Sequence, residues 1–292
     1  MPAFYAHYRF GCEALEIAAL ESAPSAIQTL CRENRALFDI GLHGPDLFFF
    51  YRPILPNRVN RIGHEAHHKS GREFLARGKK VIAAAKNKPA ARAYLYGLLC
   101  HFALDSLCHP YVAEAMAEYD VTHAAVETAF DRALLTRDGI DPQTFDPCGH
   151  FETTRRNAAV IAPFYPPAVT DIVEKSLKSM VFYGRVLYSR NRALRAVIDK
   201  GLYVTLHHDA IADMMMSEKR DAALAESDAR MYALYEEALA LVQRLFLEAG
   251  GDPLNGETAR VGFGKNLVKG RGEGKIYPPG KRARDFPLKN PQ

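Results

Sequence analysis

Apolar residues recur three or four positions apart through most of residues 12–248, which is the period of an amphipathic α-helix. Alternation of apolar and polar positions, which is typical of a half-buried strand, is scarce, and residues 200–206 are the best candidate for it. The pattern therefore predicts an all-α fold, a helical bundle. Helices are expected at residues 64–85, 89–108, 121–135, 152–162, 169–188 and 217–249.

Glycine and proline mark where several helices begin and end. Pro89 stands at the start of one helix, where no N–H is needed, and Pro110 follows its expected end. The pair Gly250-Gly251 is a plausible stop for the last helix. Two glycines and a proline within residues 41–46 predict a turn, which places Asp46 on a rigid loop.

The end of the chain differs in composition from the rest. Residues 250–292 are rich in Gly, Pro, Lys and Arg with little periodicity, so they are expected to form a tail or a surface-wrapping arm on a helical body, residues 1–249. From Arg260 onwards there are nine Lys or Arg and two Asp or Glu, which leaves 29 basic (38 − 9) and 32 acidic residues (34 − 2) elsewhere. The net charge of +4 thus belongs to the tail, which could make peripheral contact with an anionic membrane or a nucleic acid.

The sequence predicts neither membrane spans nor disulfides. No apolar run approaches the ~18 residues of a transmembrane helix. The N-terminus lacks the basic start and the apolar stretch of a secretory signal, which predicts a cytoplasmic protein. The five cysteines have no repeated spacing and no C-x₂-C pair, so free thiols are expected, with Cys100 and Cys108 in the core.

Histidines gather in the first part of the chain. Eight of the eleven fall within the first 123 residues, and imidazole is the commonest protein ligand for zinc. His150, His207 and His208 lie outside this group and are expected to be surface or hydrogen-bonding residues. The eight are His7, His43, His64, His67, His68, His101, His109 and His123.

Helical spacing adds carboxylates to these histidines. His101, Asp105 and His109 are four residues apart and project from one face of a helix. His123 and Glu127 repeat this relation on the next helix. Two helices that each offer histidine and carboxylate can hold metal ions between them, and a carboxylate can bridge two ions. The spacing therefore predicts a metal site.

Other interpretations of these residues remain open. The metal site could be purely structural within a non-catalytic helical scaffold, in which case it would be closed to water. The dipeptide His208-Asp209 is also found in HD-type phosphohydrolases, although flanking His and Asp residues do not accompany it here in the required order.

Taken in order, five segments resemble the zinc-dependent phospholipase C family, whose fold is shared with single-strand nucleases of the S1/P1 type. The resemblance covers residues 1 to about 130 and implies an all-helical domain with a multi-zinc site in its core. Residues 150–249, which the resemblance does not cover, are expected to form a helical extension of that domain. The segments are 1–11 with His7, Gly44-Pro45-Asp46, 61–74 with its histidines, His101-x-x-x-Asp105-x-x-x-His109-Pro110, and His123-x-x-x-Glu127.

The resemblance also implies ligands for two or three zinc ions. His67 is preferred to His64 and His68 because it best matches the family's position before Phe74. Secreted members complete the third site with a processed N-terminal residue, and this chain starts closer to His7, so its third ion is expected to be weak, absent or held differently. In this assignment Asp46, His67, His101 and Asp105 hold the first ion, His109, His123 and Glu127 the second, and His7 and Asp105 the third.

The implied activity is hydrolysis of a phosphate ester, either a phospholipid, a nucleotide or nucleic acid, or a small phosphomonoester. A metal-bound water of lowered pKa would attack phosphorus, with Asp46 as the candidate general base. The aromatic run 48–51 beside Asp46 could offer an apolar approach for lipid or a stacking surface for bases, or it could belong to the core.

Overall fold

The computed structural model describes residues 4–20, 25–53, 57–189, 191–202, 212–216 and 222–249. These residues form helices and turns, with no β-strand among them, so the all-α prediction is confirmed. Of the strand candidate at 200–206, the first three residues end a helix and the others lie outside the described residues. The tail 250–292, His207, His208 and Asp209 also lie outside them.

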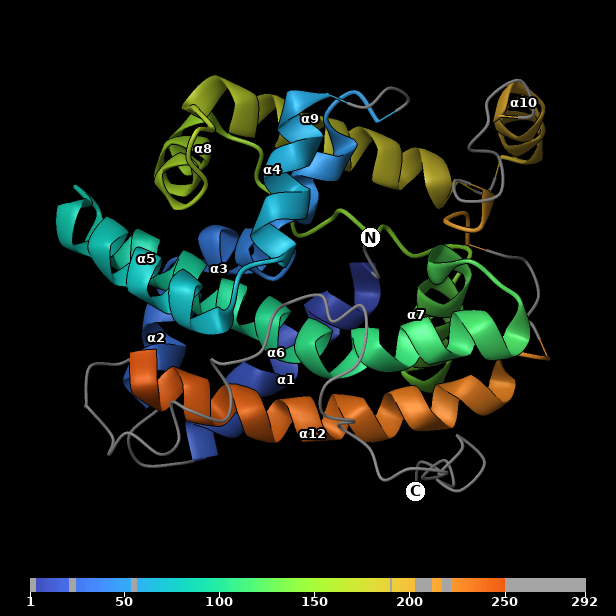
Figure 1. The fold of residues 1–292 in the computed structure, drawn as a ribbon, viewed down its shortest axis with the longest axis horizontal. Coiled ribbons are helices and arrows are strands. Elements are labelled where there is room, and N and C mark those ends of the chain that lie inside the picture. Colours follow the sequence, from blue (N-terminus) through green and yellow to red (C-terminus); the bar gives the residue numbers. More distant parts are fainter. Residues whose placement is uncertain are drawn as a thin grey trace.

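One long helix, α6 (Lys88–Tyr119), runs through the middle of the molecule (Figure 1). Helices α3 (Arg35–Gly41) and α12 (Ala225–Ala249) pack along it, and α1, α5 and α7 also contact it. The remaining elements are α1 (Phe4–Leu20), α2 (Ser25–Glu33), the 3₁₀ helix η1 (Gly44–Phe50), α4 (Arg58–His67), α5 (Gly71–Ala84), α7 (His123–Arg137), α8 (Arg155–Ile161), the 3₁₀ helix η2 (Ala162–Phe164), α9 (Thr170–Leu187) and α10 (Arg192–Leu202).

Polar side chains fix the starts of five helices. Asn57 and Ser70 form capping boxes at α4 and α5, and Asn87, Thr122 and Thr154 cap α6, α7 and α8. Each cap satisfies backbone N–H groups that have no partner within the helix and contributes about 1 kcal/mol. The caps thus fix where these helices begin.

The prediction that a helix ends before Pro110 is wrong. Helix α6 continues through Pro110 to Tyr119 and stops at Asp120, which adopts the left-handed conformation with φ 52°. A proline removes one backbone hydrogen bond. Packing of α6 against several neighbouring helices outweighs that loss. His109 consequently lies within the helix and not at its end.

Three other boundaries also differ from the sequence pattern. The region 64–85 divides at Ser70, because its hydroxyl caps α5. The expected turn at 41–46 is a shorter turn at residues 42–43 followed by η1, so Asp46 lies on a 3₁₀ helix and not on a loop. The last helix begins at Ala225, and residues 217–221 lie outside the described part. The predicted helices 121–135, 152–162 and 169–188 correspond to α7, α8 with η2, and α9.

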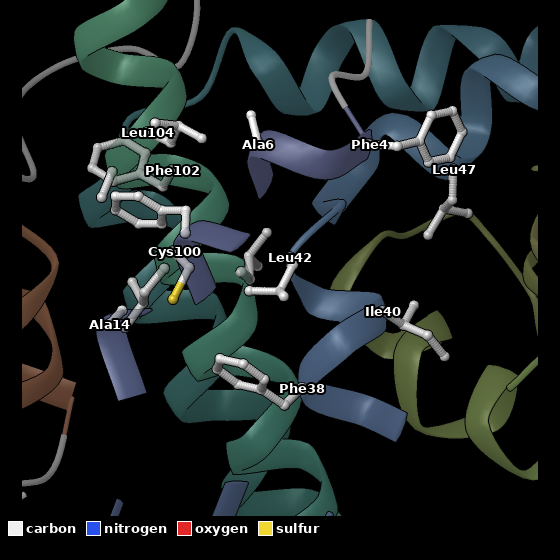
Figure 2. Packing of buried hydrophobic residues seen from close by; sticks show 14 of the residues in the cluster. Phe4, Ala6, Ala14, Phe38, Ile40, Leu42, Leu47, Cys100, Phe102 and Leu104 are labelled. Carbon is white, nitrogen blue, oxygen red and sulfur yellow. The ribbon is translucent and has the colours of Figure 1, made fainter. Parts of the chain in front are cut away.

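The core fills the space between α6 and the N-terminal helices. Phe38 and Leu42 belong to the same buried cluster as Cys100 and Phe102 of α6 (Figure 2). Gly97 lets α3 approach α6 closely, because a Cβ there would overlap the Phe38 carbonyl oxygen. All five cysteines are free thiols, with Cys100 and Cys108 buried, as predicted. This close packing holds the residues on α6 in fixed positions.

Candidate metal centre

Helix α6 places three polar side chains on successive turns of one face. His101, Asp105 and His109 are all buried. The His101 Nε2 lies 3.3 Å from Asp105 Oδ2, and the His109 Nε2 lies 3.6 Å from Asp105 Oδ1. The shared face predicted from the four-residue spacing is confirmed, and the two oxygens of Asp105 face different histidines.

Helix α7 brings a second pair against the same line. The His123 Nε2 lies 2.9 Å from Glu127 Oε1, and the same oxygen is 3.4 Å from His109 Nε2. Glu127 is buried, whereas the His123 side chain is 36% exposed. The cluster thus spans the contact between α6 and α7 and reaches the surface at His123.

The 3₁₀ helix η1 delivers Asp46 to the other side of His101. Gly44 begins η1 with φ +47°, a conformation that L side chains rarely adopt. A Cβ at Gly44 would lie 2.7 Å from Cδ2 of the His101 ring. Glycine is therefore needed for both the backbone conformation and the close approach to His101, and it lets buried Asp46 reach the cluster.

Of the three neighbouring histidines on and after α4, His67 lies in the cluster. Its Nε2 is 2.9 Å from Asp46 Oδ1, and its Nδ1 donates a hydrogen bond of 2.8 Å to the Gly63 carbonyl oxygen. That bond fixes the tautomer and leaves Nε2 with its lone pair directed at the cluster. His64 and His68 are exposed, and neither belongs to a ligand group.

His7 enters from the first turn of α1, with Nε2 3.3 Å from Asp105 Oδ1. Its position depends on Asp131 of α7, a buried carboxylate that accepts hydrogen bonds from the N–H groups of Tyr5 (2.9 Å) and Ala6 (2.7 Å). The Tyr188 hydroxyl also donates to Asp131, at 2.8 Å. The sequence analysis missed Asp131, although its place four residues after Glu127 continues the stripe that begins at His123.

The structure brings together all eight residues that the sequence singled out as candidate metal ligands. Their donor atoms fall into three groups, and the members of each group lie within 4.8 Å of one another. His101 belongs to two of the groups. Asp105, which shares a group with His7 and His101, also contacts His109 of another group. The groups are His7 with His101 and Asp105; Asp46 with His67 and His101; and His109 with His123 and Glu127.

The separations between donor atoms suit a zinc ion. Zinc–nitrogen bonds of ~2.0–2.1 Å in a tetrahedral site imply donor atoms roughly 3.3 Å apart. His67 with Asp46 and His123 with Glu127 lie at the hydrogen-bond distance of 2.9 Å. Three other separations are close to the zinc value, at 3.3 Å for His7 with Asp105, 3.3 Å for His101 with Asp105, and 3.4 Å for His109 with Glu127. They are longer than good charge-assisted hydrogen bonds, which are ~2.7–2.9 Å.

Several polar atoms of the cluster are also buried without a hydrogen bond. Within the described residues this holds for Nδ1 and Nε2 of His101, Oδ1 of Asp46 and Nδ1 of His7. A buried polar atom without a partner costs free energy. A cation bound by imidazole nitrogens and carboxylate oxygens would remove most of that cost, so the residues present fit zinc.

The carboxylates of the cluster are held in their ionised form. Burial alone raises the pKa of Asp46, but the contact with His67 outweighs it and lowers that pKa to about 2. Burial likewise raises the pKa of Asp105, yet His101, His109 and His7 lower it well below its usual range. Both carboxylates are therefore ionised at neutral pH, which is the form that coordinates a cation.

Burial lowers the pKa of His7, His101 and His109 and the nearby carboxylates raise it, and the balance differs from one histidine to the next. Burial dominates at His101 and lowers its pKa to about 4, so its ring is neutral at physiological pH. At His7 and His109 burial lowers the pKa, but the adjacent Asp105, with Glu127 at His109, raises it overall. Zinc would take the place of those protons, because a histidine coordinates metal only when it is neutral.

Comparison with known proteins supports this interpretation. A family model described as zinc-dependent phospholipase C matches residues 6–172, a span that contains every residue of the cluster. No curated protein and no solved structure matches the chain. The chain belongs to the zinc-dependent phospholipase C family.

Membership in the zinc-dependent phospholipase C family indicates a zinc-dependent hydrolase with a phosphate ester as its substrate. The family match also extends well past residue 130, into α9, so the early part of the predicted extension belongs to the family region. Among the described helices, none combines the length and the apolar character that a membrane span requires.

Two features beside the zinc-dependent phospholipase C cluster lie outside it. His43 is buried, and its Nε2 lies 2.9 Å from Nε2 of His150, so His150 is a hydrogen-bonding residue. Phe48 and Phe50 are core residues, whereas Phe49 is half-buried, with its ring stacked on His67 at 5.3 Å between centroids. Of the aromatic run, Phe49 is the residue that borders the cluster.

Proposed function

We propose that this protein hydrolyses a phospholipid at its phosphate ester, using two or three zinc ions held by the eight clustered residues. The observation that carries the proposal is the position of Asp105, whose two oxygens lie between the three groups at separations typical of shared zinc ligands. Such a bridging carboxylate holds neighbouring ions close enough to act on one phosphate.

We propose three positions for the ions, each with its own residues. Each position draws on residues of one ligand group, although the group of His7 also contains His101. Asp105 would connect the positions through its contacts with His101, His109 and His7. The third position has the fewest protein donors. The first position comprises Asp46, His67, His101 and Asp105; the second comprises His109, His123 and Glu127; and the third comprises His7 and Asp105.

Zinc, when bound, supplies a positive charge for the phosphoryl oxygens and lowers the pKa of a water molecule toward ~7. Asp46 is the proposed catalytic residue. Its pKa of about 2 makes it a weak base, so we assign it mainly to orienting the attacking water through a hydrogen bond that it accepts. The half-buried ring of Phe49, next to His67, would contact the apolar part of the substrate.

Exposure of His123 supports an active site over a structural metal site. A structural zinc site is closed to water, whereas the group of His109, His123 and Glu127 reaches the surface through a side chain that is 36% exposed. We therefore propose that substrate approaches the second ion from the side of His123.

A substrate panel tests the proposal. Zinc-loaded protein would be given a short-chain phosphatidylcholine, a single-stranded oligonucleotide and a phosphomonoester, before and after chelation and after zinc is returned. We expect zinc-dependent hydrolysis of the phosphatidylcholine with release of phosphocholine. Zinc-dependent cleavage of the oligonucleotide alone would instead mark a nuclease of the P1 type. Bound zinc with no turnover on any substrate would mark a scaffold.

A further inference from the structure

A strongly basic segment lies in the helical body, away from the metal centre. Residues 71–92 contain seven Lys or Arg and one acidic residue, Glu73. They form α5 and the first turns of α6. Because the chain without its tail is slightly acidic overall, this segment concentrates positive charge on one part of the body.

A groove runs between the C-terminal end of α5 and α8, which lie on the same side of the molecule (Figure 1). Its volume is about 610 Å³, within the ~300–1,000 Å³ of typical ligand sites. Among the described residues no acidic one lines it, and its polar lining residues are Lys80, Lys86 and Arg156, which form the rim, with Asn87. The apolar floor consists of Val81, Ala84, Ala85, Ala159, Val160 and Pro163.

The charges on the rim have no ion-pair partner in the described part of the chain. Among the described residues no ion pair involves Lys80, Lys86 or Arg156, and all three side chains are exposed. The neighbouring Arg155 contrasts with them, because it pairs with Asp171 at 2.6 Å and with Glu174 at 3.3 Å. As far as residues 4–249 are described, the rim therefore presents three unpaired cations around an apolar floor.

We propose that this groove, with the basic face of α5, is a docking site for an anionic phospholipid membrane. Rim cations would contact head-group phosphates, and the apolar floor would accept part of an acyl chain. A nucleic acid would use the cations but has no need of the aliphatic floor. The metal centre is separate, because His101 lies roughly 20 Å along α6 from Lys88 at 1.5 Å per residue. Docking there does not depend on which phosphate ester the centre cleaves.

Vesicle sedimentation tests the docking site. The full-length, zinc-loaded protein is mixed with vesicles of phosphatidylcholine, alone or with added phosphatidylglycerol, for times too short for measurable lipid hydrolysis. The groove variant Lys80→Glu/Lys86→Glu/Arg156→Glu is compared with the control Arg32→Glu/Arg61→Glu/Lys175→Glu, which reverses three exposed charges elsewhere. Zinc content and turnover of a soluble substrate confirm that both variants are folded.

We expect wild-type protein to bind the vesicles that contain phosphatidylglycerol. One basic residue near an anionic membrane contributes about 1 kcal/mol, or about fivefold in binding, so the groove variant should bind on the order of 100-fold more weakly. The control variant should change by less than about threefold. Ala159→Asp, which places a charge on the floor, should also weaken binding by about fivefold or more.

Three results would overturn the proposal. If the groove and control variants lost vesicle binding equally, binding would depend on the net charge of the protein and not on this groove. Unchanged vesicle binding by the groove variant would assign the interaction to another surface, such as the tail. Loss of binding to a single-stranded oligonucleotide, with vesicle binding retained, would identify a nucleic-acid site. Absence of phospholipid hydrolysis would contradict the proposed function but leave these binding results unaffected.

Discussion

The Nε2 of His7 lies 3.3 Å from Oδ1 of Asp105, a contact that joins the first turn of α1 to the middle of α6. The same carboxylate contacts His101 at 3.3 Å through its other oxygen and His109 at 3.6 Å. Asp105 is therefore the one residue of the described cluster that contacts histidines of all three ligand groups. Its removal should affect more than one ion.

Replacement of Asp105 by asparagine tests this bridging position. The amide has one carbonyl oxygen and no charge, so it cannot serve two cations. We expect the zinc content of Asp105→Asn to fall by more than one equivalent per chain, with loss of nearly all activity. Asp120→Asn is the matched control, because Asn tolerates the left-handed conformation at that position. A loss limited to one equivalent would contradict the bridge.

Gly44 offers a second test, on a residue that binds no metal itself. Gly44→Ala adds a methyl group 2.7 Å from the His101 ring and also strains a residue with φ +47°. Gly139→Ala has comparable backbone strain at φ +74°, with open space around the added carbon. Both should lose ~1–2 kcal/mol of stability, but only Gly44→Ala should weaken zinc binding, by about 10- to 100-fold. Equal zinc affinities would show that η1 does not position His101.

Asp131 is expected to act on zinc through the position of His7. The two carboxylate oxygens of Asp131 accept hydrogen bonds from three donors, whereas an asparagine side chain there would offer one carbonyl oxygen. At least one of these hydrogen bonds is therefore lost or weakened in Asp131→Asn, at a cost of about 1–3 kcal/mol in folding free energy. We predict a lower melting temperature and about tenfold faster loss of one zinc equivalent to a competing chelator. Tyr188→Phe removes only one of these bonds and should retain all its zinc. Uniform loss of every equivalent in Asp131→Asn would indicate general unfolding.

Local spacing made much of the centre predictable, and long-range packing determined the rest. The pairs on α6 and α7 follow from four-residue intervals on helices, so His101 with Asp105 and His123 with Glu127 needed only the sequence. The continuation of α6 through Pro110 could not be predicted locally, because neighbouring helices stabilise it.

Contacts between distant parts of the chain account for the features of the structure that were not predictable from the sequence. Asp131 acts on backbone groups about 125 residues away, which no local pattern reveals. The choice of His67 over His64 rested on family resemblance alone until the Gly63 hydrogen bond and the contact with Asp46 were visible. The basic groove combines α5 with α8, two segments that only the fold brings together.

The tail is expected to be dispensable for the chemistry. Every proposed ligand lies before residue 130, and residues 250–292 are basic and aperiodic. A chain that ends at Gly251 should therefore keep its zinc and its rate on a small soluble substrate. Loss of zinc, or unfolding, would show that the tail is part of the body. A slower rate on vesicles alone, reproduced in the full-length protein by high salt, would identify the tail as an electrostatic tether.

The central claim is that the zinc cluster directs water onto the phosphorus of a phospholipid. Hydrolysis of a short-chain phosphatidylcholine by the zinc-loaded protein in ¹⁸O-labelled water tests it most directly, with mass analysis of both products. Attack at phosphorus predicts one ¹⁸O atom in the released phosphocholine and none in the diacylglycerol, and chelation should abolish the reaction. Label in the diacylglycerol, unlabelled phosphocholine, or no hydrolysis by protein with its full zinc content would contradict the account.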